Sequence, residues 1–422
     1  MHARRTLLGI SIFWIPLSLL GDGFSSLIVP VRVSELVEPA RAATVLGVVT
    51  FAGLLAGMLV QPVAGAVSDR LYPRWGRRAV LICAAALIVA ALVVFAAARS
   101  VAGLLVTFVL LMLAANIAQA TQQAFIPDRV EPGWRGRAAG LKTLFDVGGA
   151  FVGFVILGVL VAGGDVLPAV AAGALIVIVA AVVTVALVDE RDRPVSSGGP
   201  GRGPADGAAP IRVVTSEPFV RVVVARFLFL LGTYAIGRFF LLYVADRLGL
   251  DPATAGDEAG GLLAALTLVT ALGAIPAGWI VDRVGRVETM LGGAALSGAG
   301  ALLLIVAQAP LQILLFGGLM SLGSAAFAVA NWAMTSDLAP QSQAGRLFGI
   351  ANFGTAGAAA LAGLFGPLVD GTRSVAPGIG YGVVFIGAVV SFLLSMVAIR
   401  PLAEPNDERS HQIPARARRS DA

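Results

Sequence analysis

Long apolar stretches alternate with short polar ones along the whole chain. Twelve of them are apolar over about 20 residues, the length that an α-helix needs to cross the roughly 30 Å hydrocarbon layer of a bilayer. They lie near residues 7–31, 43–66, 79–98, 101–126, 140–163, 166–188, 222–245, 259–281, 288–307, 311–335, 347–369 and 379–400. The pattern predicts an all-α integral membrane protein with twelve transmembrane helices. The first stretch follows Arg4 and Arg5 as a secretory signal would, but it lacks a small-residue cleavage site, so we interpret it as a membrane helix.

Two polar segments predict the domain organisation. The longer one begins at Asp189 and continues as a Pro- and Gly-rich stretch without a hydrophobic pattern. The other follows the last apolar stretch and is rich in arginine. The predicted parts are an N-terminal six-helix bundle over 1–188, a cytoplasmic linker over 189–218, a C-terminal six-helix bundle over 219–400 and a disordered cytoplasmic tail over 401–422.

Composition narrows the function classes. Of the 422 residues, 58% are hydrophobic and 13% are charged, whereas a soluble domain carries about 25% charged residues. Cys83 is the only cysteine, and His2 and His411 are the only histidines. Disulfides, Cys- or His-based metal sites and His-dependent catalysis therefore have no candidates, and we predict no metal, no cofactor and no enzyme activity.

The net charge of +5 reflects membrane topology rather than a nucleic-acid surface, because the basic residues flank the apolar stretches. With both termini cytoplasmic, most basic residues lie on the cytoplasmic side, as the positive-inside rule requires. The exceptions are Arg32, Arg41, Arg99, Arg247 and Arg373 on the opposite side, and Arg226 and Arg238 within an apolar stretch. We expect a multi-pass protein of the plasma membrane with both ends in the cytoplasm.

A loop motif occurs once in each half of the chain. Gly65, Asp69, Arg70, Gly76 and Arg77 recur as Gly278, Asp282, Arg283, Gly285 and Arg286. The two aspartates are 213 residues apart and the glycines 76 and 285 are 209 apart, because the first loop has four extra residues. The offset of 209 also relates Asp128 and Arg137 to Asp337 and Arg346. Six stretches separate the copies, so the sequence predicts two parallel six-helix repeats about an axis normal to the membrane.

This doubled G-x-x-x-D-R…G-R loop resembles that of the major facilitator superfamily of secondary transporters, and the resemblance covers all twelve stretches. It implies a cavity between the two bundles near the membrane midplane, which alternates between the two sides as one bundle rocks against the other. The expected partners are a small-molecule substrate, a coupling proton or cation and the lipid bilayer. One chain supplies both halves, so we expect a monomer to function.

A narrower resemblance links the chain to the glycoside-pentoside-hexuronide and sucrose-type sugar symporters. It rests on the first loop, residues 59–78, and on the spacing of Asn116, Gln119, Phe125 and Asp128. Gln123 stands where sucrose-type proteins carry a sugar-binding arginine. Gly57 and Gln61 stand where melibiose-type members carry paired cation-binding aspartates.

The charged residues of the repeated loops are predicted to form a cytoplasmic gate. Carboxylates can meet helix N-termini, and arginines can bridge to carboxylates of the other half in one conformation and release them in the other. The alternative is that the arginines only anchor the topology. The gate residues are Asp69, Arg70, Gly76, Arg77, Arg78, Asp128, Arg137, Asp282, Arg283, Arg286, Asp337 and Arg346.

Two ionisable side chains lie deep within apolar stretches, where a charge is costly and usually faces a cavity or a partner. Asp22 follows Arg5 by 17 residues and Arg238 follows Arg221 by 17, so each lies about 25 Å from its basic anchor at 1.5 Å per residue. We expect Asp22 to bind the coupling cation or proton, and Arg238 to set its proton affinity or to hold substrate. A permanent ion pair, or an Asp22 in an outer vestibule, is the alternative.

Other polar residues within the stretches suit hydrogen bonding to substrate hydroxyls, although interhelical hydrogen bonds explain each of them equally well. Serines at helical spacing extend the polar stripe of Asp22. Lys142 and Asp146 are four residues apart and are expected to pair locally, and Arg226 is expected to snorkel to the inner surface. The candidates are Ser18, Ser25 or Ser26, Asn116, Gln119, Gln123, Tyr234, Asn331, Thr335, Asn352 and Thr355, with Trp14 and Trp332 as cavity walls.

These features favour cation- or proton-coupled uptake of a sugar-like or other small polar solute. Proton-coupled export of a lipophilic compound is the alternative, because position 123 lacks the arginine and the helix faces are apolar. An ATP-driven pump is disfavoured, since the only lysine, Lys142, lies outside any Walker A spacing. A non-transporting receptor or a membrane-embedded enzyme is a minor alternative.

Overall fold

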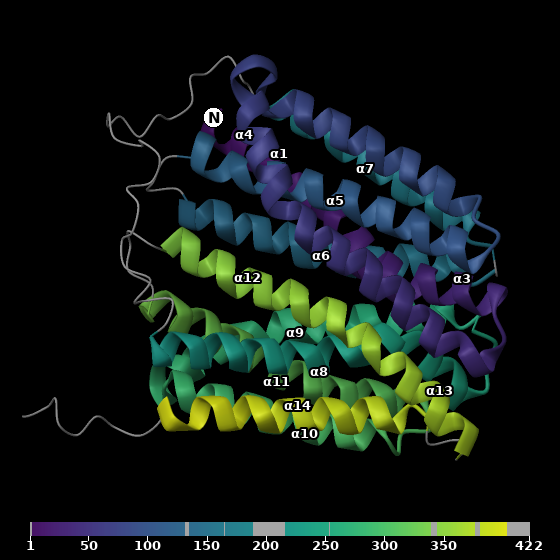
Figure 1. The fold of residues 1–422 in the computed structure, drawn as a ribbon. Helices are drawn as coiled ribbons and strands as arrows, with labels where there is room; N and C mark the ends of the chain where they lie inside the picture. Colours follow the sequence, from purple (N-terminus) through teal and green to yellow (C-terminus); the bar gives the residue numbers. More distant parts are fainter. Residues whose placement is uncertain are drawn as a thin grey trace, which may run out of the picture.

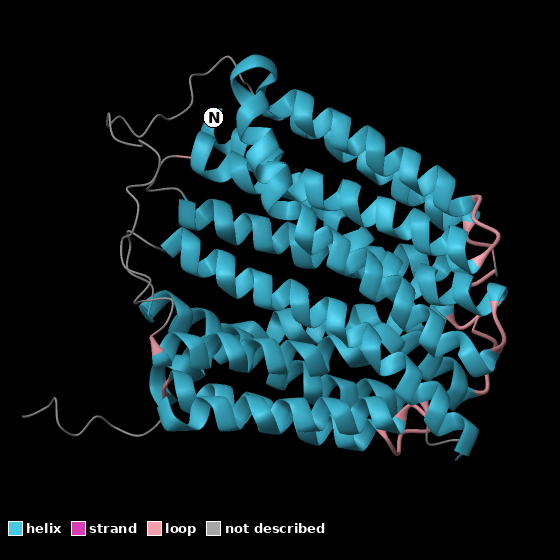
Figure 2. Cartoon of the chain, viewed as in Figure 1, coloured by secondary structure: helices cyan, strands magenta, loops and turns pink. Residues whose placement is uncertain are grey.

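The computed structural model describes residues 2–130, 135–163, 165–188, 216–252, 254–338, 344–375 and 380–402. Over these residues the regular structure is helical, without strands (Figure 2). The helices are α1 (His2–Ile12), α2 (Trp14–Ser18), η1 (Leu19–Ile28), α3 (Val29–Leu36), η2 (Pro39–Arg41), α4 (Ala42–Ala96), α5 (Val101–Arg129), α6 (Arg135–Val161), α7 (Leu167–Leu187), α8 (Glu217–Leu248), α9 (Gly256–Val284), α10 (Arg286–Leu304), α11 (Pro310–Leu338), α12 (Ala344–Leu361), η4 (Ala362–Phe365), α13 (Gly366–Val375), α14 (Gly382–Ile399) and η5 (Arg400–Leu402). Twelve helical spans of the described chain are long and apolar enough to cross a membrane, and each overlaps a predicted stretch. The predicted all-α, twelve-span fold is confirmed.

The spans lie side by side, with the N-terminal helices in purple and blue on one side and the C-terminal helices in green and yellow on the other (Figure 1). We call the end where α1 begins and α14 ends the terminal face, and the end where α3 ends and α5 begins the distal face. The predicted linker lies outside the described residues apart from its last three, and α8 begins within it at Glu217. The predicted tail also lies outside them, apart from residues 401 and 402.

Apolar side chains cover the outside of the molecule as well as its interior. Leu59, Val93, Leu175 and Leu393 are each at least half exposed, as suits helices whose surroundings are hydrocarbon. Inside the C-terminal half, the ring of Phe229 stacks on that of Phe327 with 3.9 Å between centroids. Because lipid gives helices no hydrophobic reason to associate, such close packing carries much of the cohesion.

The repeated loop glycines adopt matching backbone conformations. Gly76 interrupts α4 with φ 72° and ψ 167°, and Gly285 separates α9 from α10 with φ 107° and ψ 162°. This region of φ/ψ space is open to glycine and strained for other residues. The internal repeat predicted from the spacing of these glycines therefore appears in the backbone itself.

The first span is not a regular α-helix. Its central part, η1 (Leu19–Ile28), is a π-helix that contains Asp22, and π-helical turns are frequent at functional sites. The serines predicted to share the polar stripe face protein rather than lipid. Ser18 Oγ donates to Asp146 of α6, and the carbonyl of Ser25 accepts a hydrogen bond from Arg238 of α8.

Candidate functional site

A cavity of about 280 Å³ lies between the two halves. The predicted residues Asn116, Gln119, Gln123, Tyr234 and Asn352 all line it, together with Thr355. The first three come from α5, Tyr234 comes from α8, and Asn352 and Thr355 come from α12. Both halves therefore contribute hydrogen-bonding groups to one space.

Sequence reasoning missed two further polar residues of the cavity. Gln61 of α4 and Lys142 of α6 line it on the N-terminal side. Gln61 could have been identified from the sequence, because it is an amide within a predicted membrane span. Lys142 was predicted to pair with Asp146, with a proton role as the alternative. The pairing is confirmed, with Lys142 Nζ 3.1 Å from Asp146 Oδ2. The Nζ also lies 3.9 Å from the centroid of the Trp14 ring, a favourable cation–π distance.

Asp22 lies beside this cavity without a direct partner. Its neighbour Gly21 lines the cavity, and its own side chain is exposed. Its helix η1 packs against α6 and α8, and the charges of Asp146 on α6 and Arg238 on α8 lie within electrostatic range of its carboxylate, so Asp22 lies among the helices of the bundle. Among the residues that the structure describes, no hydrogen bond or ion pair satisfies it.

Arg238 does not form an ion pair with Asp22. Its side chain is buried, and Nη1 donates to the carbonyl of Ser25 over 3.2 Å. Since Ser25 belongs to the N-terminal half, this hydrogen bond joins the two halves. The two charges predicted to face each other thus interact at longer range, and Arg238 holds helices together.

The predicted place of Arg226 is wrong. Arg226 does not reach toward the inner surface but lies between helices of the C-terminal half. Its Nε donates to Thr355 Oγ1 over 3.0 Å, and Nη1 donates to Asn331 Oδ1 over 3.1 Å. The physical reason is helical rotation: five residues advance an α-helix by about 500°, which turns Arg226 about 140° away from Arg221. Arg221 instead pairs with Glu217 over 2.7 Å.

Asn331 and Trp332 support Arg226 rather than line the cavity. Asn331 is fully buried, and its Nδ2 donates to the carbonyl of Val222 over 3.3 Å. The guanidinium carbon of Arg226 lies 5.0 Å from the centroid of the Trp332 ring. Thr335 is also buried, and its hydroxyl donates a hydrogen bond to the carbonyl of Asn331.

The contacts between halves that the structure describes gather toward the distal face. The backbone N–H of Thr44 donates to Asp370 Oδ2 over 2.7 Å. A second contact joins α6 and α9: a Cβ at Gly260 of α9 would lie 2.6 Å from the carbonyl oxygen of Phe154 in α6, so these helices touch backbone to backbone. The two helices can approach this closely only because glycine has no side chain.

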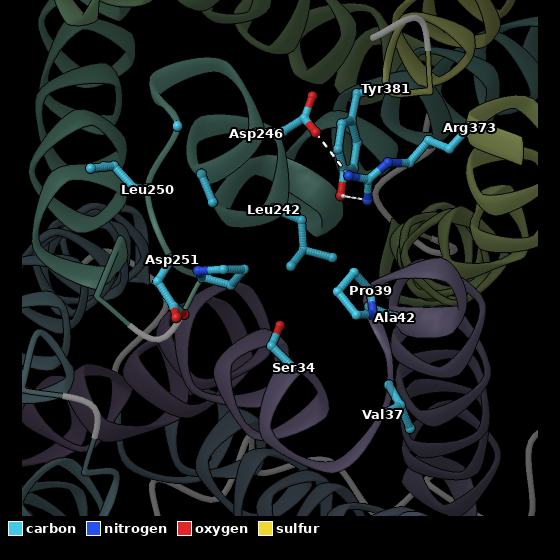
Figure 3. A pocket seen from close by; sticks show the side chains of 13 residues that line it. Ser34, Val37, Pro39, Ala42, Leu242, Asp246, Leu250, Asp251, Arg373 and Tyr381 are labelled. Carbon is cyan, nitrogen blue, oxygen red and sulfur yellow. Dashed lines mark hydrogen bonds and ion pairs between the residues drawn. The ribbon is translucent and has the colours of Figure 1, made fainter. Parts of the chain in front are cut away.

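A second cavity, of about 420 Å³, lies between the halves at the distal face. Figure 3 shows Ser34 and Pro39 of the N-terminal half on one side and the Asp246, Arg373 and Tyr381 cluster on the other. Arg373 pairs with Asp246 over 2.9 Å and donates to Tyr381 Oη over 3.4 Å. Burial raises the pKa of the Tyr381 phenol, so it stays neutral at physiological pH.

The predicted gate residues gather at the terminal face. Arg286 at the start of α10 forms an ion pair with Asp337 near the end of α11, within the C-terminal half. Arg77 is buried and donates to Ser68 Oγ over 2.7 Å, within the N-terminal half. Arg70, Arg137, Asp282 and Arg283 are exposed, Arg78 is half-buried, and the side chains of Asp69, Asp128 and Arg346 lie outside the described part of the chain.

The sequence identifies the class of protein that this fold and cavity define. Residues 6–256 and 222–420 match the model of the Major Facilitator Superfamily, so the chain belongs to this family of membrane transporters. Among curated proteins none matches the chain significantly. The match is to the superfamily as a whole and selects no branch within it.

Solved structures share the fold at low identity. A mutant of the nucleoside transporter NupG has a TM-score of 0.73 at 12% identity, covering 94% of this chain and 100% of that one. The POT family transporter PepTSo has a TM-score of 0.72 at 11% identity, covering 94% and 98%. A bacterial homolog of the human lysosomal transporter Spinster, in an inward-facing and unoccupied conformation, has a TM-score of 0.69 at 13% identity, covering 94% of each chain. These similar proteins are membrane transporters rather than enzymes.

Proposed function

We propose that this protein is a secondary active transporter that takes up a small polar solute together with a proton or another cation. The observation that carries the proposal is Asp22, an exposed carboxylate without a described partner, beside a cavity that both halves line. An ionisable group at this depth is expensive and usually functional. A cation or proton arriving at Asp22 would neutralise it and relieve its repulsion with Asp146.

The cavity lining supports a polar substrate. Asn116, Gln119, Gln123 and Asn352 present amides, which can both donate to and accept from hydroxyl groups. This lining agrees with the resemblance of the first loop to sugar symporters, and a sugar-like solute is the substrate class that we propose first.

Alternating access gives the cavity its two openings. We place the closed end at the distal face, and the contacts of Thr44 with Asp370 and of α6 with α9 support this assignment. With both termini in the cytoplasm, as the arginine distribution predicts, the closed end is the extracellular one. The gate residues of the terminal face would then come together when the halves rock and the distal contacts break.

Export of a lipophilic compound with a proton is a second candidate. The same cavity is walled by Leu17, Leu54, Met58 and Met112. Methionine side chains adapt to varied apolar shapes, which suits a lipophilic substrate.

A proton-flux assay tests the proposal. Purified protein is reconstituted in liposomes that contain a pH-sensitive dye, and sugars, glycosides, organic acids or lipophilic cations are added outside. We expect a polar solute to drive acidification of the lumen, and Asp22→Asn to abolish that acidification while solute exchange persists. The matched control is Asp257→Asn, which removes an exposed carboxylate from the first turn of α9.

Two results would count against uptake. Proton movement that survives in Asp22→Asn would remove this carboxylate from coupling. Proton release driven only by lipophilic cations would favour the exporter.

A further inference from the structure

Arg226 is a cation within the membrane that the proposed coupling does not use. It lies on α8 next to the cavity, because its hydrogen-bond partner Thr355 lines the cavity wall. Tyr234, two turns further along α8, also lines the cavity. The guanidinium is therefore at the edge of the space that both halves share.

The charges deep in the described spans balance except for Arg226. Asp146 pairs with Lys142 over 3.1 Å, and Asp22 interacts electrostatically with Arg238. The described partners of Arg226 are uncharged, namely the hydroxyl of Thr355 and the amide of Asn331. A cation without a counter-ion at this depth is costly, so such a group usually serves a ligand.

The neutral partners fix the orientation of Arg226 without compensating its charge. The hydroxyl of Thr355 donates a hydrogen bond to the carbonyl of Ala351 over 3.2 Å and accepts one from Arg226. The amide of Asn331 donates to Val222 and accepts from Arg226. Trp332 covers one side of the guanidinium. Nη2 has no partner among the described residues, so this edge of the guanidinium is available to an acceptor.

From this arrangement we propose that Arg226 binds the anionic group of the transported solute, and that this group is a carboxylate. An oriented guanidinium with its Nη edge available suits bidentate binding of a planar carboxylate. One uncompensated positive charge matches a monovalent anion better than a phosphate monoester, which carries about −1.5 to −2 at neutral pH. The cavity amides would hold the hydroxyls of the same molecule. The anion site stands on its own geometry, whereas its role in transport rests on the proposed function.

The first test detects anion binding near Arg226 and does not require the substrate to be known. Trp332 is 41% exposed, and iodide is an anion that quenches tryptophan fluorescence on contact. The difference between the native protein and Trp332→Phe, in an uncharged detergent, isolates the signal of Trp332. A unit charge about 4 Å away raises the local concentration of a monovalent anion about fivefold even at the dielectric constant of water. We expect Arg226→Gln to lower iodide quenching of Trp332 by about this factor.

The controls separate charge from accessibility. Acrylamide, a neutral quencher, is expected to act equally on the native protein and on Arg226→Gln. Asn331→Asp leaves Arg226 in place but adds a carboxylate beside it, and it is expected to lower iodide quenching as Arg226→Gln does. Iodide quenching that is unchanged in both variants, or that falls in parallel with acrylamide quenching, would overturn the site.

The second test concerns the substrate class. In thermal-unfolding assays we expect glucuronate to stabilise the native protein more than glucose does, and Arg226→Gln to remove that difference. A difference that persists in Arg226→Gln, or equal stabilisation by the acid and the neutral sugar, would contradict the carboxylate assignment. If iodide quenching depends on Arg226 but no solute is taken up under a gradient of protons or of another cation, the anion site stands and the proposed transport function fails.

Discussion

Asn331 and Asn116 show how differently two membrane amides can be used. Asn331 is fully buried and joins Arg226 to the carbonyl of Val222. Asn116 lines the cavity and donates to the carbonyl of Met112 in its own helix. Removing a buried partner leaves the other group unsatisfied, whereas water can replace a partner in a cavity.

We therefore expect Asn331→Leu to lower the free energy of unfolding by about 1–3 kcal/mol, and Asn116→Leu to change it far less. Thermal unfolding of both variants in detergent, monitored by intrinsic fluorescence, measures the difference. Equal losses of stability would mean that the contacts of Asn331 do not distinguish it from an ordinary cavity residue.

At this scale the sequence predicts which residues are polar within a span but not which way they point. Asn116, Gln119 and Gln123 line the cavity as predicted, because amides on one helix face share an environment. Asn331 and Arg226 differ from expectation because their contacts depend on the rotation of α8 and α11 about their axes. Both of these helices carry apolar side chains on every face, so the hydrophobic periodicity does not show which face points toward the interior.

The loops of the terminal face depend on two glycines with positive φ. Gly76 and Gly285 lie in a region that is strained for residues with a Cβ. Gly65 and Gly278 belong to the same repeated motif but lie inside helices with open space around them. A Cβ at Gly285 would also lie 2.5 Å from Glu288 Oε2, but this is the end of a flexible side chain, so the two pairs differ mainly in backbone conformation.

We expect Gly76→Ala and Gly285→Ala each to destabilise the protein by about 1–3 kcal/mol. Gly65→Ala and Gly278→Ala should be neutral or stabilise it by up to about 1 kcal/mol, since glycine is the poorer helix former. Chemical unfolding of the four variants checks this contrast. Destabilisation by all four alike would show that the motif is sensitive for reasons other than φ.

The positions of the helices could be predicted from the sequence where one property, such as hydropathy, determines them. Hydropathy predicted the twelve spans, and the repeated spacing of Gly76 and Gly285 predicted the duplication. The π-helix η1 was not predictable, since its residues are as apolar as those of a regular helix. Its wider turns follow from packing against other helices, which the local sequence does not contain.

The whole molecule is held in one conformation by contacts between the halves toward the distal face. Gly260 meets the backbone of α6 there, whereas its neighbour Gly261 has open space around it. A large side chain at 260 would keep α6 and α9 apart, and the same side chain at 261 would not. Which end is closed could not be predicted from the sequence, because both conformations use the same helices.

Alternating access requires that one face of the molecule opens as the other closes. Its most direct test is a pair of distances measured by double electron–electron resonance in a Cys83→Ala background, with spin labels replacing exposed residues. One pair, at Arg99 and Leu311, spans the distal face, and the other, at Leu71 and Val284, spans the terminal face.

Gly260→Leu should lengthen the distal distance and shorten the terminal one in the same sample, and Gly261→Leu should change neither. A longer distal distance with an unchanged terminal distance would contradict alternating access, because it would mean that the two halves do not move as rocking bodies.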